Sequence, residues 1–362
     1  MRRLTLVTAV LGLLACQQVP VALDGAPVPD VGPDGPPSLP WVSTYAGTSC
    51  GVPWGDSSRL QAPMDYPGDI TFHPATGNIC FLDGIRVRVI RGDQIVTFAG
   101  PVNGSTQKDG PALETDFWTL HALAVAANGT MFVTERARVR KIQGGMVTTL
   151  AGVHNENAHV DGPAETARFV NIRALAIDLD GGLLIGDTFG IRKLKDGVVS
   201  TIAGSGPWSG SHPTISGDGP ATEVQLLQPS GLLVESDGIL FGEGYRIRRL
   251  RNGQIETLAG TIQHTRFPKP RDGPLDQALF VAIHTLRRRG DRLYFIDDPN
   301  RIRMIENDRV TTVNPLTQPG MRDGPLDQAL FDRPWALALF GSTGLLVSDA
   351  MNYRLRLIQL AE

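Results

Sequence analysis

The chain has 362 residues, 41% of them hydrophobic, with 34 Lys and Arg against 37 Asp and Glu, a formal charge of −3 at pH 7. A chain of this length and apolar content can bury a large core. Its weak charge gives no electrostatic basis for a nucleic-acid partner, so that class of protein is not expected.

The N-terminal residues have the composition of an export signal. Arg2 and Arg3 precede the apolar run Leu4–Ala15, which is too short to span a bilayer. Cys16 follows directly. This order resembles the lipobox of bacterial lipoproteins, which implies cleavage before Cys16 and lipidation of its thiol. An ordinary secretory signal with an incidental cysteine is the alternative.

The segment after Cys16 reads PVPDVGPDGPPSLP in its second half, and such density of Pro and Gly cannot form a packed core. The sequence therefore predicts a signal peptide at residues 1–15, a lipidated cysteine with its tether at 16–40, and a folded domain at 41–362. Gln17, rather than Asp, favours the outer membrane in such lipoproteins. We expect an exported protein anchored by lipid to the bacterial cell envelope.

Two further cysteines, Cys50 and Cys80, would meet an oxidising compartment after export. Cys80 lies in a predicted strand, where a cysteine is equally well a small buried apolar residue. The sequence leaves a disulfide between them open.

An internal repeat organises the folded domain. The nine residues DGPLDQALF occur at 272–280 and again at 323–331, and looser copies begin at Asp109, Asp161 and Asp218. Identity over nine residues at such a distance indicates duplicated structural units.

Each unit predicts four short strands joined by tight turns. In the second unit they are residues 120–125, 130–135, 138–142 and 146–152, and five of the six units close on Ala-Gly. Four strands in about 50 residues are typical of a β-propeller blade. The last unit has only three strands, and Trp41–Gly47 has the pattern of the missing fourth. The sequence therefore predicts an all-β, six-bladed propeller of four-stranded antiparallel blades, the last closed by the N-terminal strand.

The repeated pattern V-x-T-[LI]-A-G, D-G-P-A and acid-x-x-N-x-R-[IVL]-R resembles the NHL repeat, best in residues 196–204 and 348–358. The resemblance implies a propeller that presents one face to a protein, a peptide or a glycan. It extends to six-bladed enzymes such as peptidyl-hydroxyglycine amidating lyase, gluconolactonase and strictosidine synthase. In blade three, Gly190 replaces the first Arg of the pattern.

One acid ends the second strand of every unit, followed by arginines in the third. We expect these acids to be structural, because each can accept backbone N–H bonds and pair with a guanidinium. They are Asp83, Glu135, Asp187, Glu243, Asp297 and Asp349. The run Arg287–Arg289 departs from the repeat, and we expect a solvated hairpin tip there.

Function is expected where the units differ, at the entry to the first strands, which should rim the channel mouth. The candidate ligand-binding residues there are Asp69, His121, Arg173, His284 and Trp335. Such a set could bind a small anionic or polar ligand. A solvated rim without a ligand is the alternative.

Metal-capable side chains are densest between His154 and Asp161, where His154 and His159 are candidate ligands of zinc. The spacing fits no standard zinc motif. His121 and His284 are a second pair for zinc or calcium, but no third ligand is identifiable, so no cofactor is assigned.

Two functions remain. The first is a membrane-anchored binding or scaffold module for an envelope protein, peptide or glycan, with no nucleic acid. The alternative is an enzyme of lyase or lactonase type at the channel, for which the sequence shows no catalytic motif. The sequence favours the binding module.

Overall fold

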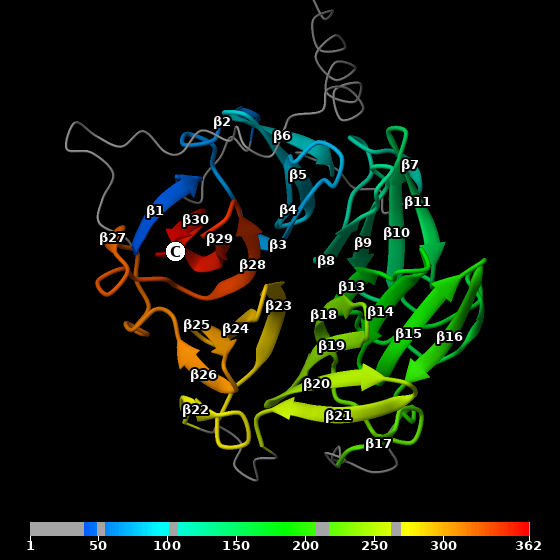
Figure 1. Cartoon of the computed structure of the whole chain (residues 1–362). Helices are drawn as coiled ribbons and strands as arrows, with labels where there is room; N and C mark the ends of the chain where they lie inside the picture. The colour runs from blue at the N-terminus through cyan, green and yellow to red at the C-terminus, as the bar shows by residue number, and fades with distance from the viewer. Residues whose placement is uncertain (1–39, 49–54, 101–107, 208–216, 262–268, 362) are drawn as a thin grey trace, which may run out of the picture.

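Six antiparallel sheets are arranged around a central axis like the blades of a propeller (Figure 1). The computed structural model describes residues 40–48, 55–100, 108–207, 217–261 and 269–361. We number the blades in chain order of their innermost strands. The predicted all-β, six-bladed architecture is confirmed.

Strands of equivalent position share their place in each blade. The innermost strands are β3 (Pro67–Phe72), β8 (Leu120–Val125), β13 (Ala174–Ile177), β18 (Ser230–Glu235), β23 (Ile283–Arg289) and β28 (Pro334–Phe340). The second strands are β4 (Ile79–Asp83), β9 (Met131–Glu135), β14 (Leu183–Asp187), β19 (Gly238–Glu243), β24 (Arg292–Asp297) and β29 (Gly344–Asp349). The third strands are β5 (Arg86–Arg91), β10 (Arg138–Gln143), β15 (Gly190–Lys195), β20 (Arg246–Arg251), β25 (Arg301–Glu306) and β30 (Arg354–Gln359). The fourth strands are β6 (Gln94–Ala99), β11 (Met146–Ala151), β16 (Val198–Ala203), β21 (Gln254–Ala259), β26 (Arg309–Thr312) and β1 (Trp41–Ala46). A short 3-10 helix, η3 (Ala350–Asn352), follows β29.

Each blade has a fifth, outermost strand that the sequence pattern did not predict. These strands are only two residues long: β2 (Ser57–Ser58), β7 (Gly110–Pro111), β12 (Gly162–Pro163), β17 (Gly219–Pro220), β22 (Gly273–Pro274) and β27 (Gly324–Pro325). All but the first are the Gly-Pro of the repeated Asp-Gly-Pro. Proline lacks an N–H to donate and so fits an edge strand. A run of two residues carries no alternation, so its pairing is invisible in the sequence.

The core lies between blades rather than within one. The second strands are buried along almost their whole length, because a neighbouring sheet covers each face. Phe81 of blade one packs in one cluster with Leu346 and Leu357 of blade six. Equivalent clusters fill the other five blade interfaces.

The N-terminal strand completes blade six, as predicted. β1 pairs antiparallel with β30, with Val42 opposite Ile358, and on its other side with β27, with Val42 opposite Gly324. The side chain of Val42 enters the cluster between blades five and six. The first and last parts of the described chain thus share one sheet.

A fully buried arginine in each third strand joins the repeated acids, which confirms their structural role. In blade five, Arg303 lies 2.8 Å from Asp297 Oδ2 and 2.7 Å from Asp272 Oδ1 and also donates to the carbonyl oxygens of Leu279 and Arg271. Its equivalents are Arg88, Arg140, Arg192, Arg248 and Arg356. A buried guanidinium is tolerated because carboxylates and carbonyls surround it.

The expectation of a solvated tip at Arg287–Arg289 was wrong. Arg287 donates to Ile70 O of blade one at 3.3 Å, and Arg288 forms an ion pair with Glu235 of blade four. Arg289 donates to the carbonyl oxygens of Gly341 and Gly344 in blade six, at 3.1 and 2.7 Å. Three consecutive arginines therefore connect blade five to three other blades.

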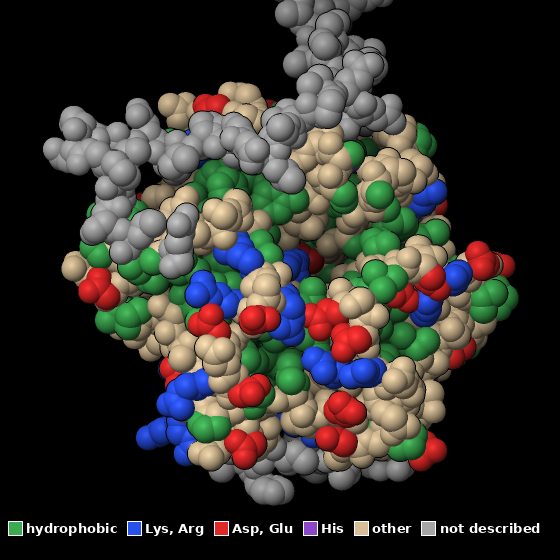
Figure 2. Space-filling model, viewed as in Figure 1, with side chains coloured by type: hydrophobic (Ala, Val, Ile, Leu, Met, Phe, Trp, Pro, Cys, Tyr) green, Lys and Arg blue, Asp and Glu red, His purple; other side chains and the backbone are tan. Residues whose placement is uncertain are grey.

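Positive and negative side chains are intermixed on the face of the disc shown in Figure 2. Among the residues placed in the structure, no helix has the length and apolar character needed to cross a membrane. Cys80 is buried in β4, whereas Cys50 lies outside the described residues, so the question of a disulfide between them stays open. Cys16 and the tether as far as residue 39 lie outside them too.

Candidate functional site

The ends of the innermost strands enclose a cavity of about 460 Å³ at the channel. All five residues predicted for the channel mouth line it: Asp69, His121, Arg173, His284 and Trp335. They come from five different blades, on β3, β8, the residue before β13, β23 and β28. The structure therefore brings the predicted set together, and its binding of a ligand stays a prediction.

Irregular strand pairing aims several of these side chains. The register of β8 against β9 shifts between Leu120 and Leu123, the span that contains His121. The register of β23 shifts between Ile283 and Leu286, the span that contains His284. A bulge bends its strand and redirects a side chain, and bulges are common at functional sites. Strand alternation alone would not give these directions.

His284 stacks on Trp335, with ring centroids 4.5 Å apart and an interplanar angle of 27°. Its Nε2 atom is buried and has no hydrogen-bond partner among the described residues. Burial lowers the pKa of His284, the negative charge of Asp298 opposes this, and the positive charge of Arg173 lowers the pKa further. The imidazole is therefore neutral at pH 7.

His121 has a similar environment. Burial lowers the pKa of His121 to about 4, and the nearby guanidinium of Arg173 contributes in the same direction. Both imidazoles at the cavity are consequently uncharged at neutral pH, and each can accept or donate a hydrogen bond.

Arg173 has no carboxylate partner within ion-pair distance in the described part of the chain. If the Asn171 amide is turned so that its oxygen faces the guanidinium, that oxygen accepts from Nε and Nη2 of Arg173, at 3.1 Å each. Burial lowers the pKa of Arg173, and no neighbouring acid offsets the effect. A guanidinium remains charged under these conditions because its intrinsic pKa is above 12.

Arg287 crosses the channel from blade five toward blade one. Its Nη2 lies 3.9 Å from Asp69 Oδ1. Asp69 also accepts from the backbone N–H groups of Ile70 and Leu123, at 2.9 Å each, which links blades one and two. Burial raises the pKa of Asp69, and Arg287 opposes this shift.

Two cavity residues, Arg287 and Asp298, are not among those that the repeat pattern predicts for the channel mouth. Arg287 was assigned to a hairpin tip. Asp298 directly follows the repeated acid, at a position where the other blades carry Gly84, Arg136, Thr188, Gly244 and Ala350. A comparison of the units at that position would have identified Asp298 as specific to blade five.

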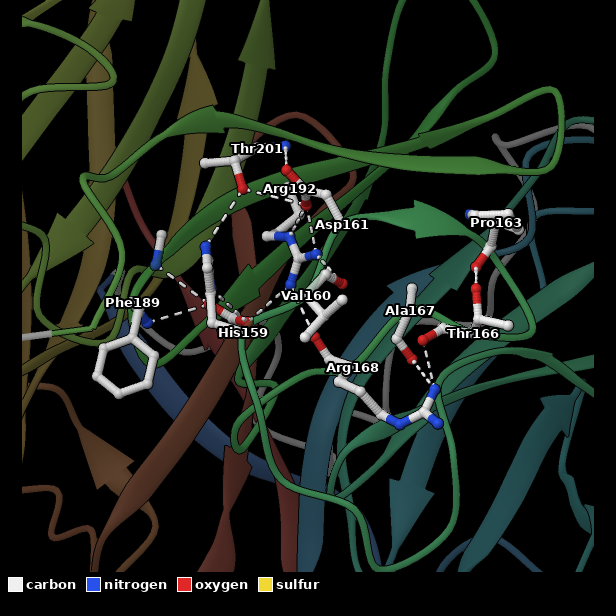
Figure 3. Close-up of polar contacts among 12 residues, drawn as sticks. His159, Val160, Asp161, Pro163, Thr166, Ala167, Arg168, Phe189, Arg192 and Thr201 are labelled. Carbon is white, nitrogen blue, oxygen red and sulfur yellow. Dashed lines mark hydrogen bonds and ion pairs between the residues drawn. The ribbon is translucent and has the colours of Figure 1, made fainter.

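The two candidate zinc ligands do not form a shared site in the described residues. His159 Nδ1 lies 3.6 Å from Asp187 Oδ2, and its Nε2 lies 3.3 Å from Thr201 Oγ1 (Figure 3). The His159 ring also meets the Phe189 ring edge-on, at 6.0 Å between centroids. His154 is exposed, and no group of three or more His, Cys, Asp or Glu with metal-binding geometry occurs where the structure is described. His159 thus has partners within blade three.

Comparison with known proteins supports the architecture. No protein-family model matches the chain. The chain is 32% identical to teneurin-3 of Danio rerio over 198 residues. The match covers 44% of this chain but only 7% of teneurin-3. An auxiliary nutrient binding protein from Bacteroides thetaiotaomicron superposes with a TM-score of 0.64 at 14% identity, over 88% of this chain and 76% of that one. A gluconolactonase from Xanthomonas campestris superposes with a TM-score of 0.51 at 12% identity, over 82% of this chain and 87% of that one.

These likenesses show the fold. At such low identities to solved structures, the names nutrient binding protein and gluconolactonase describe those proteins and assign no function to this chain.

Proposed function

We propose that this protein is an exported, lipid-anchored binding module that holds a polar ligand in the cavity at its channel mouth. The ligand would come from an envelope peptide, protein or glycan. One observation carries the proposal: residues that differ between the repeats line one cavity, and they include His121, Arg173, His284 and Trp335. The repeated acids and arginines, in contrast, are buried and pair with one another within the blades. A rigid scaffold with variable residues at one opening is a common way to build a binding site.

The size and composition of the cavity support a small or terminal group as the ligand. About 460 Å³ lies within the range of small-molecule sites. Its lining combines polar groups with the stacked rings of His284 and Trp335. Nutrient binding by a protein of similar fold is in keeping with this proposal.

An enzyme of lactonase or lyase type is the second candidate. It is favoured by the two neutral imidazoles at the cavity, which can act as bases, and by the gluconolactonase of similar fold. Against it, the Nε2 atom of His284 is buried and so is not presented to a substrate.

The test uses the full chain in detergent and a panel of short peptides, mono- and disaccharides, and sugar lactones. We expect at least one compound to raise the melting temperature and to give a calorimetric binding isotherm, with no loss of compound over hours. Ala282→Phe, which places a ring in the cavity, should abolish binding. Ala127→Phe, in the exposed turn after β8, is the control.

Conversion of any compound by the wild type, but not by Ala282→Phe, would replace the binding proposal with the enzyme. Binding that survives Ala282→Phe would move the site elsewhere on the propeller.

The anchor rests on the run Leu4–Ala15 followed by Cys16. We expect the wild type to fractionate with membranes and to gain the mass of a lipid at Cys16. Cys16→Ser should move the protein to the soluble exported fraction, because several acyl chains are needed for stable attachment. Unchanged membrane association in Cys16→Ser would contradict the proposed anchor.

A further inference from the structure

We propose that the ligand of this cavity carries a carboxylate, bound by the guanidinium of Arg173, with hydroxyl or ammonium groups directed toward Asp298. This inference rests on the proposed binding function and names the chemical class of its ligand. The class is a small polar carboxylic acid, whether a sugar acid or the free carboxyl end of a peptide.

Arg173 differs from the other enclosed arginines in its partners. Each buried arginine of the third strands meets a carboxylate, as Arg303 does with Asp297 and Asp272. Arg287 faces Asp69 across the channel. Arg173 alone among the cavity arginines has no acid partner in the described residues. A partly buried positive charge without a counter-charge is costly unless a ligand supplies one.

The guanidinium of Arg173 is held on one edge and available on another. In the Asn171 orientation given above, the amide oxygen holds Nε and Nη2, so one edge of Arg173 is fixed. The remaining nitrogen, Nη1, has no hydrogen-bond partner among the described residues, although Arg173 lines the cavity. A guanidinium oriented on one edge and available on another is suited to a planar carboxylate.

The charges that line the cavity favour a singly charged anion. His121 and His284 are neutral and Arg287 faces Asp69, so Arg173 supplies the one positive charge without an acid partner among the described lining residues. That matches a singly charged anion. Asp298 and Asp69 also line the cavity and would attract hydrogen-bond donors of the ligand. A carboxylic acid with hydroxyl or ammonium groups complements both kinds of charge. The second negative charge of a dianion would be repelled by the carboxylates of Asp298 and Asp69.

The test compares acids with neutral counterparts on the full chain by isothermal titration calorimetry. The sugar arm uses D-glucuronate against D-glucose, and the peptide arm uses L-alanyl-L-alanine against its C-terminal amide. We expect at least one acid to bind tenfold or more tightly than its counterpart, because a charge-assisted hydrogen bond is worth at least that factor. The arm that binds identifies the source of the carboxylate.

Arg173→Met should remove this preference, and Arg173→Lys should restore it in part, because lysine keeps the charge but not the planar fork. Arg251→Met, which changes an exposed arginine on β20, should bind as the wild type does. A thermal melt of each variant establishes that it is folded. If Arg173→Met does not fold, Arg173→Lys still tests the proposal.

Equal binding of acid and neutral compounds, unaffected by Arg173→Met, would overturn the carboxylate assignment and leave the binding function in place. Binding of none of the four probes would also overturn it for these two sources. Failure of the binding function itself would appear separately, as the absence of any hit in the wider panel.

Discussion

In blade three, an imidazole takes the place that a guanidinium has in neighbouring blades. Arg86, Arg138 and Arg246 begin their third strands and pair with the acid of their own blade. The equivalent residue in blade three is Gly190, where a Cβ would collide with the carbonyl oxygen of Ala203. His159 reaches Asp187 from the preceding loop instead. A departure from the repeat is thus compensated by a residue outside the repeat.

This substitution predicts a structural role for His159. His159→Ala should lower the free energy of unfolding by about 1 kcal/mol, because Asp187 and Thr201 each lose a polar neighbour. Thermal melts would register this as a drop of a few degrees. His154→Ala, at an exposed position in the same loop, should leave the melting temperature unchanged. Equal melting temperatures for both variants, together with loss of bound zinc from both, would favour the metal site instead.

At the scale of the strand, β23 shows what local reading of a sequence can and cannot provide. Four strands per blade were predictable because alternation and turn residues recur within each unit. The channel residues were predictable because units of similar length can be aligned at the same strand start. The partners of Arg287 were not, because Ile70 is 217 residues away and becomes a neighbour only when the ring closes.

The same limit applies to the bulges and to the outermost strands. The shifts that aim His121 and His284 occur inside continuous strands, where no turn residue marks them. A two-residue strand such as Gly273–Pro274 has no pattern of its own and is defined by its partner, β26. Pairing between strands, rather than the propensity of one strand, determines these features.

At the scale of the whole molecule, β1 closes the ring and contributes side chains to two blade interfaces. Tyr45 is buried between blades six and one, and Val42 between blades five and six. Thr44 donates from its backbone N and its hydroxyl to Asp323, at 2.9 and 2.8 Å, and Asp323 in turn pairs with Arg356. Loss of β1 would therefore expose two interfaces and the edge of β30 at once.

Deletion of residues 41–47 should consequently lower the free energy of unfolding by roughly 5 kcal/mol or more, given about 1.5–3 kcal/mol for each large apolar side chain that loses its burial. Differential scanning calorimetry should show a much lower melting temperature and a broader transition, because an open ring loses cooperativity between its end blades.

Rescue is available by moving residues 41–48 to follow Glu362 through a short Gly-Ser turn. Trp41 lies opposite Gln359, so the moved strand would form a hairpin with β30 in the native register. Recovery of the wild-type melting temperature in this permuted chain would show that strand pairing, not chain order, holds the ring. A deletion variant that melts as the wild type does would mean that the blades cohere without this strand, contrary to the closure described here.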